Sequence, residues 1–137
     1  MKHLLKYLFL LMIGGTIYYL IEIAARGFSH WTMFIVGGIC FVLVGVINEI
    51  TPRIPILRQM VLSAIIITAI EFVSGCILNI WLGLDIWDYS DEIGNILGQI
   101  CPKHTLYWFL LSLAGILIDD YIRYLFFGEE KPKYEFI

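Results

Sequence analysis

The sequence predicts an all-α integral membrane protein with four transmembrane helices, and three observations support this fold class. Of the 137 residues, 60% are hydrophobic and 15% are charged, and the mean hydropathy is +0.84. Soluble domains are about 45–50% apolar and about 25% charged, so a soluble core of this size could not bury so much apolar surface. The third observation is that the apolar residues gather in four long stretches.

Each stretch is long enough to cross a bilayer, because about 20 helical residues span about 30 Å of hydrocarbon. We expect the spans at about residues 4–25, 31–48, 57–82 and 105–127, followed by a tail at 128–137. Pro52 and Pro55 separate the second span from the third, since a helix does not easily continue through proline. At this length, residues 1–137 are expected to form a single transmembrane domain.

The distribution of lysine and arginine predicts that both termini lie in the cytoplasm, because cytoplasmic segments are enriched in these residues. In this orientation only Arg26 and Lys103 lie on the outer side. The other basic residues lie inside or at the inner boundary: Lys2, Lys6, Arg53, Arg58, Arg123, Lys131 and Lys133. An alternative interpretation makes residues 1–25 a cleaved signal peptide, but Glu22 and the length of the apolar stretch are unusual before a cleavage site.

The connection between the third and fourth spans, residues 83–104, differs in kind from the others. It combines acidic with aromatic residues and then continues with an apolar run at 93–101 that is too short to cross the bilayer. Aromatic residues of this kind gather at the level of the lipid headgroups. We therefore expect an outer-side re-entrant or interfacial segment, with its backbone covered by protein.

Glu71 interrupts the third span, which is otherwise uncharged from Gln59 to Leu84. A charged side chain at the centre of a bilayer costs on the order of 2.5–3.5 kcal/mol on insertion scales, so this carboxylate, expected near the middle of the membrane, needs a partner or a function. Small and polar residues share its helix face: Ala64, Thr68, Gly75 and Asn79. Such a face is typical of contacts between helices in lipid.

Two further acids are each followed by an arginine four residues later. Glu22 precedes Arg26, and Asp119 precedes Arg123 in a small and polar face of the fourth span. Such pairs can neutralise each other near a helix end, so a structural role stays open beside a functional one. Because Glu22, Glu71 and Asp119 are expected at different depths, convergent faces would suit a proton or cation path.

Several classes of function lack support in the sequence. The net charge of −3 gives no reason to expect nucleic-acid binding. Cys40, Cys76 and Cys101 form no C-x-x-C pair, and we expect neither a metal site nor a cofactor. His30 and His104 lie at the outer boundary and complete no catalytic signature, so we predict no catalytic residue.

Several of these residues also belong to a family pattern. Its most specific part is the string Trp87-Asp-Tyr-Ser90 with Asn95-Ile-Leu-Gly98-Gln-Ile-Cys101; shorter parts are Leu20-Ile-Glu22, Arg26-Gly-Phe28 and Ile70-Glu71-Phe-Val-Ser-Gly75. Over about residues 15–115 the chain resembles the putative type IV ABC transporter permeases, a family of small bacterial membrane proteins. The resemblance implies a bacterial inner-membrane protein with a role in transport.

The chain departs from the family pattern after Phe28, where Ser29-His-Trp31 replaces an Asn-Gly-Pro turn, so no ligand contact of that turn is carried over. The sequence contains no G-x-x-x-x-G-K-[ST] motif. In an ATP-driven system, a separate ATPase would therefore supply the energy. Four helices are few for a permeation path, and we expect a homo-oligomer or a larger membrane complex.

The leading hypothesis is a transporter component or small-substrate membrane binder with an outward-facing acidic and aromatic pocket. The candidate binding residues are Glu22, Arg26, Glu71, Asn79, Trp87, Asp88, Tyr89 and Asn95. Aromatic side chains beside carboxylates suit an organic cation, whereas Arg26 suits an anion, and the sequence leaves the sign open. The alternatives are a structural or regulatory subunit of a membrane complex and an intramembrane acid/base enzyme that acts on a lipid-like substrate.

Overall fold

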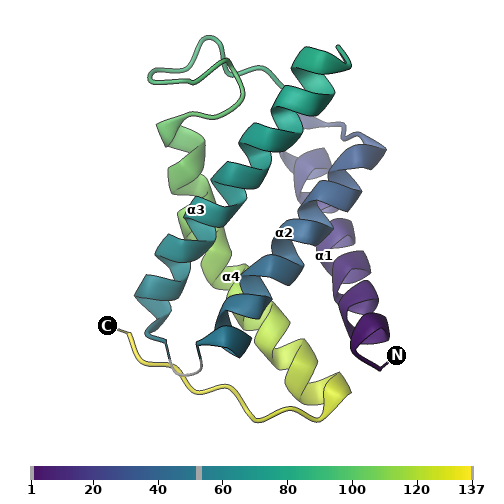
Figure 1. Ribbon diagram of the computed structural model, residues 1–137, viewed down its shortest axis with the longest axis vertical. Coiled ribbons are helices and arrows are strands. Elements are labelled where there is room, and N and C mark those ends of the chain that lie inside the picture. Colours follow the sequence, from purple (N-terminus) through teal and green to yellow (C-terminus); the bar gives the residue numbers. More distant parts are fainter. Residues whose placement is uncertain (1, 52–53, 137) are drawn as a thin grey trace.

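The computed structural model describes residues 2–51 and 54–136, except for the side chain of Lys2. The protein consists of long helices (Figure 1). In chain order these are α1 (Lys2–Arg26), α2 (Trp31–Ile50), α3 (Ile56–Gly75) and α4 (Pro102–Phe127); a short π-helix, η1 (Cys76–Trp81), extends α3. Within these two ranges, four helices are long and apolar enough to span a membrane, and no strand occurs. The predicted fold class is confirmed to that extent, while Pro52 and Arg53 lie outside the described residues.

Two helix boundaries differ from the sequence-based expectation. The fourth helix begins at Pro102 rather than at about Thr105, because proline suits the first helical position and Cys101 before it is extended. The third span ends in a π-helical turn, in which the Leu82 amide donates to the Ile77 carbonyl at 2.9 Å. The connection between these helices therefore covers residues 82–101 rather than 83–104; we call it the loop.

The helices α1 and α2 form the most closely packed pair. A Cβ atom added at Gly15 would collide with the Phe34 carbonyl of α2, and one added at Gly38 would collide with the Leu11 carbonyl of α1. Small residues allow such close approach of helix backbones in lipid. The helix α4 packs mainly on α3 and α2 and has few contacts with α1, which leaves room between α1 and α4.

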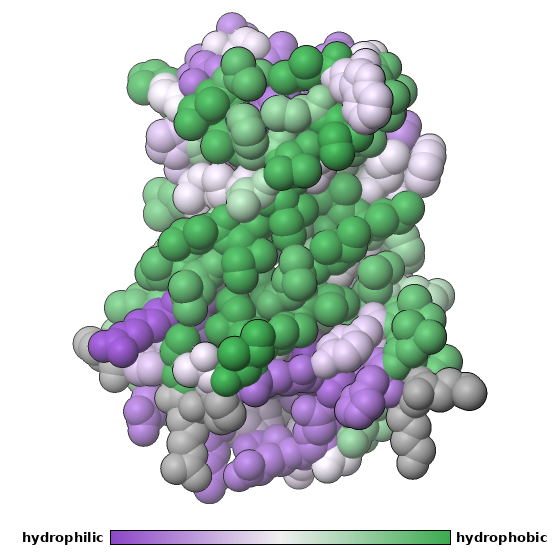
Figure 2. All heavy atoms as spheres, viewed as in Figure 1, coloured by the Kyte–Doolittle hydropathy of each residue, from purple (hydrophilic) through white to green (hydrophobic). Residues whose placement is uncertain are grey.

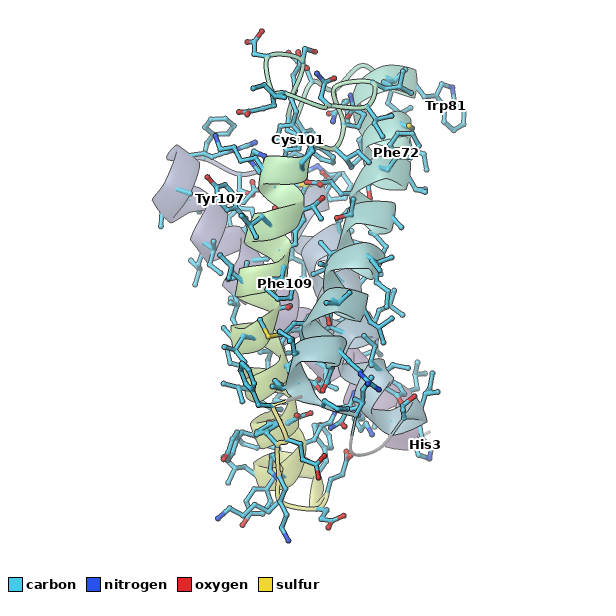
Figure 3. All side chains as sticks on the ribbon, turned by 90° about the vertical axis from the view of Figure 1, so that its left-hand side faces the viewer. His3, Phe72, Trp81, Cys101, Tyr107 and Phe109 are labelled. Atoms are coloured by element: carbon cyan, nitrogen blue, oxygen red, sulfur yellow. The ribbon has the colours of Figure 1, made fainter. Side chains whose placement is uncertain are left out.

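The two ends of the bundle differ in composition. Both chain termini lie at one end, and the loop lies at the other (Figure 1). Between them an apolar band covers the face of the bundle shown in Figure 2, and hydrophilic residues gather at both ends. Trp81 points away from the bundle at the loop end, while His3 lies near the end that carries the termini (Figure 3). This distribution matches a protein whose apolar band contacts lipid.

Candidate functional site

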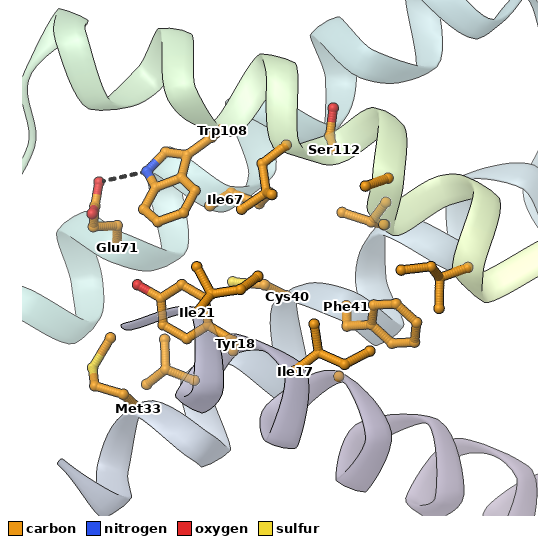
Figure 4. Close-up of a pocket in the computed structure, with 18 of the residues that line it drawn as sticks. Ile17, Tyr18, Ile21, Met33, Cys40, Phe41, Ile67, Glu71, Trp108 and Ser112 are labelled. Carbon is orange, nitrogen blue, oxygen red and sulfur yellow. Dashed lines mark hydrogen bonds between the residues drawn. The ribbon is translucent and has the colours of Figure 1, made fainter. Parts of the chain in front are cut away.

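A pocket of about 150 Å³ lies between the helices, and α1, α2, α3 and α4 all contribute to its lining (Figure 4). Its walls are mostly apolar, and among the described residues that line it Glu71 contributes the only carboxylate. Ile21 of α1 and Leu111 of α4 line the pocket and are also exposed on the surface of the bundle. The pocket therefore reaches the apolar surface between α1 and α4.

The Glu71 side chain is buried, and each of its oxygens accepts one hydrogen bond. The Tyr89 hydroxyl donates to Oε2 at 2.9 Å, and the Trp108 indole N–H donates to Oε1 at 3.1 Å. Burial and the neighbouring Glu71 carboxylate raise the pKa of Tyr89, so its hydroxyl keeps the proton that it donates. Both donors are neutral, and in the described part of the chain Glu71 forms no ion pair.

The loop and the start of α4 hold Tyr89 in place. Its amide donates to the Gly98 carbonyl at 2.7 Å, which joins the two sides of the loop. Its ring stacks on the His104 ring with the centroids 4.1 Å apart. His104 in turn lies 3.0 Å from the Cys101 sulfur through Nδ1. Contacts of the loop backbone and of the first turn of α4 thus hold the Tyr89 hydroxyl against Glu71, which lines the pocket.

Asn79 of η1 attaches the other side of the loop to the end of the third span, and Trp87 joins two parts of the loop. The buried Trp87 ring lines the pocket, and its indole N–H donates to the Gln99 carbonyl at 3.1 Å. The Asn79 amide donates to Gln99 Oε1 at 2.8 Å, and its Oδ1 accepts from the Ile86 amide at 2.6 Å. Asn79 therefore positions the loop, and Trp87 forms part of the pocket wall.

Glu22 and Arg26 lie beside the pocket without lining it. Glu22 accepts hydrogen bonds from the Tyr18 hydroxyl at 2.8 Å and the Ser29 hydroxyl at 3.1 Å. Arg26 lies 3.6 Å from Glu22 through Nη2, which also donates to the Ile86 carbonyl at 3.1 Å. Since Tyr18 lines the pocket, it is the side chain that joins Glu22 to the pocket wall.

Asp88 and Asn95 contact the backbone of the loop rather than the pocket. Asp88 accepts hydrogen bonds from the side chain and the amide of Ser90, and these bonds lower the pKa of Asp88. Asn95 donates to the Ser90 and Glu92 carbonyls and accepts from the Gly98 amide at 3.0 Å. These two candidates shape the turn that carries Tyr89.

Asp119 and Arg123 belong to a group of charged residues at the end of the bundle that carries the termini. This group, the ionic cluster, consists of Lys6, Glu49, Asp119, Arg123 and Glu129. Arg123 Nε lies 3.0 Å from Asp119 Oδ2, and Arg123 also pairs with Glu49 of α2. Lys6 of α1 bonds to Glu49 at 2.9 Å and to Glu129 at 3.0 Å. Asp119 does not line the pocket, so the cluster and Glu71 occupy separate places.

The sequence analysis did not predict two contacts of the site, although the spacing of the residues indicated each of them. Trp108 lies four residues before Ser112, which puts it on the pocket-facing side of α4. Cys101 and His104 are three residues apart where α4 begins, so their side chains meet. A sequence pattern shows which residues share a helix face, but not that this face lies opposite Glu71.

The bundle, its apolar band and its internal pocket define a small multi-pass membrane protein. The model of the family described as "Putative ABC-transporter type IV" matches residues 6–129, and the chain belongs to this family. The resemblance noted in the sequence is thereby confirmed, and the protein is a component related to membrane transport. No curated protein and no solved structure matches the chain.

Proposed function

We propose that this protein is the small-substrate-binding component of a bacterial inner-membrane transporter and that the pocket at Glu71 is its binding site. The observation that carries the proposal is a buried acid that faces a pocket lined by α1, α2, α3 and α4 and that, within the described residues, bonds only to neutral donors. Acids within membrane spans are costly and mark substrate or ion pathways. A mostly apolar pocket with a few convergent polar groups is the usual form of a small-molecule site.

We further propose that both termini face the cytoplasm, so that the loop and the pocket lie toward the outer side. Lys6 and Arg123 lie at the end that carries the termini, whereas Arg26 and Lys103 lie at the loop end. In the sequence, the segments expected on the side of the termini contain more lysine and arginine than those expected on the side of the loop, which supports this orientation. The loop then lies at the outer interface, where its aromatic residues contact the headgroup region.

In this proposal the loop closes the pocket, because Tyr89 connects it directly to the acid. A substrate that binds the Glu71 carboxylate competes with the Tyr89 hydroxyl for Oε2. Loss of that hydrogen bond would loosen the loop and open the pocket toward the outer side. Transport then requires partners, either a second copy or a larger membrane complex with a separate ATPase, and the chain itself catalyses no reaction.

Uptake experiments test this function against the alternative of a structural subunit. Cells that lack the gene would receive the wild type, Glu71→Gln or Glu130→Gln, the last being a control at an exposed tail position. Accumulation of a panel of labelled small organic solutes would be measured. We expect the wild type and the control to restore uptake of at least one solute and Glu71→Gln to fail. Full uptake with Glu71→Gln would favour a structural or regulatory subunit, which needs the chain but not its acid.

A further inference from the structure

We infer that the pocket takes a small organic cation: an amine whose apolar group is about the size of a benzene ring. The inference rests on the proposed function and adds the charge and size of the substrate. It follows from three properties of the pocket, which are the sign of its charge, the arrangement of its aromatic rings and its volume.

The sign of the charge comes from the side chains that line the pocket. Within the part of the chain that the structure describes, they include the Glu71 carboxylate but no lysine, arginine or histidine. Arg26, which would suit an anion, is bonded to the Ile86 carbonyl and lies beside Glu22 outside the lining. A buried charge without a counter-ion is unfavourable. A cationic ligand would neutralise ionised Glu71, whereas an anion would find no opposite charge.

Aromatic rings next to Glu71 provide a second attraction for a cation. The rings of Tyr18 and Trp108 have centroids 5.8 Å apart with their planes tilted by 53°, and both rings line the pocket. Trp87 adds a third aromatic ring to the lining. Aromatic faces attract ammonium groups within about 6 Å of the ring centroid. An ammonium group bound to Glu71 is therefore expected close to the Trp108 ring.

The volume and the walls define the rest of the ligand. Apolar cavities of about 150 Å³ are known to hold a benzene molecule, and this pocket has about that volume. Away from Glu71 its walls are apolar, with Ile17, Val44 and Ile67 among them. Such walls favour a hydrocarbon ring and disfavour a second polar group. Gly115 lines the same space, and a Cβ atom added there would have no neighbour within 4 Å.

Calorimetric titrations of the purified full-length protein in lipid nanodiscs test this inference. The probes are benzylamine, benzyl alcohol and benzoate, which share a ring and differ in charge, and empty nanodiscs correct for partition into lipid. The variants are Glu71→Gln, which removes the acid, and Gly115→Leu, which fills the pocket without meeting a neighbour at Cβ. Leu113→Phe, at an exposed position outside the pocket lining, is the control for added bulk on α4.

We expect the wild type and Leu113→Phe to bind benzylamine at least about tenfold more tightly than the other two probes, as a charge-assisted hydrogen bond implies. Glu71→Gln should abolish this preference, and Gly115→Leu should abolish binding of benzylamine. Equal binding of benzyl alcohol, or tighter binding of benzoate, would overturn the inference and leave the proposed pocket function standing. Benzylamine binding that persists in Gly115→Leu would also overturn it, because the amine would then bind elsewhere. The uptake experiment with Glu71→Gln judges the proposed function separately.

Discussion

Acidic side chains at the two ends of the bundle have opposite kinds of neighbours. In the ionic cluster, Asp119 and Glu49 have cations as neighbours, and Arg123 joins both of them across α4 and α2. At the loop end, Glu71 has two neutral donors and faces a pocket. The first arrangement neutralises the acids with residues of the chain and ties helices together. The second gives the acid no cationic partner among the described residues, so we relate the cluster to stability and propose a role in binding for Glu71.

Removal of the cluster's arginine should give the largest loss of stability. Arg123→Met would leave Asp119, which is fully buried, and Glu49 without this partner. Loss of one partner of a buried ion pair costs about 3–5 kcal/mol in the free energy of unfolding. Thermal unfolding of the detergent-purified protein measures the change. Arg58→Met, at an exposed position of α3, serves as the matched control and should cost far less. Equal losses in the two variants would contradict a structural role of the cluster.

A pair of glycine substitutions compares the packing of the two regions. A Cβ atom at Gly45 of α2 would collide with the Asp119 carboxylate, whereas one at Gly115 of α4 would enter open pocket space. We expect Gly45→Ala to lower the free energy of unfolding by about 1–3 kcal/mol, as overpacking does. Gly115→Ala should cost no stability, because alanine also favours the helix. Thermal unfolding would again be the measurement, and a larger loss in Gly115→Ala would mean that the pocket is filled by protein.

The hydrogen bond between the loop and the acid should have a smaller effect on stability. Tyr89→Phe removes the donor to Glu71 Oε2 and keeps the ring that stacks on His104. We expect a loss of about 0.5–1.5 kcal/mol in the free energy of unfolding and faster hydrogen exchange in the loop. Tyr107→Phe, which alters an exposed ring of α4, is the control. Unchanged exchange in Tyr89→Phe would show that the loop does not depend on Glu71.

The smallest effect is expected in the tail that follows α4. The Tyr134 hydroxyl donates to Asp120 at 2.8 Å, and burial together with Asp120 raises the pKa of Tyr134. The tail also accepts a hydrogen bond from the Ile56 amide at 2.7 Å, at the start of α3. Because Tyr134 is partly exposed, Tyr134→Phe should cost about 0.5 kcal/mol. Faster cleavage of the tail in limited proteolysis would detect this effect. A loss of stability as large as that of Arg123→Met would show that the tail is part of the core.

Hydropathy predicted the helices well because lipid requires long apolar stretches, whatever their neighbours are. It predicted the start of α4 less well, since the decisive signal was Pro102 after an extended Cys101 rather than a change in hydropathy. The π-helical turn at Cys76–Trp81, in which Asn79 accepts a hydrogen bond from the loop, had no recognised signal in the sequence.

The candidate site was predicted in part. Glu71 was identified from its position in an uncharged span, and Trp87 and Tyr89 were identified as its companions from the loop. The sequence did not reveal Trp108 as a partner of Glu71, because periodicity does not show which helices lie opposite each other. The sequence also left the charge of the proposed ligand open, because it did not show that Arg26 is bonded to the Ile86 carbonyl and lies outside the pocket lining.

The most direct test of the difference between the two ends is a single variant with two measurements. In Glu71→Gln the amide keeps the shape of the acid; its oxygen can accept from the Trp108 indole and its NH2 group can donate to the Tyr89 hydroxyl, so the charge is lost while both contacts can persist. On one nanodisc preparation we expect the free energy of unfolding to change by about 1 kcal/mol or less, while benzylamine binding weakens at least about tenfold. A large loss of stability with undiminished binding would contradict our account, because Glu71 would then be a structural residue like those of the ionic cluster.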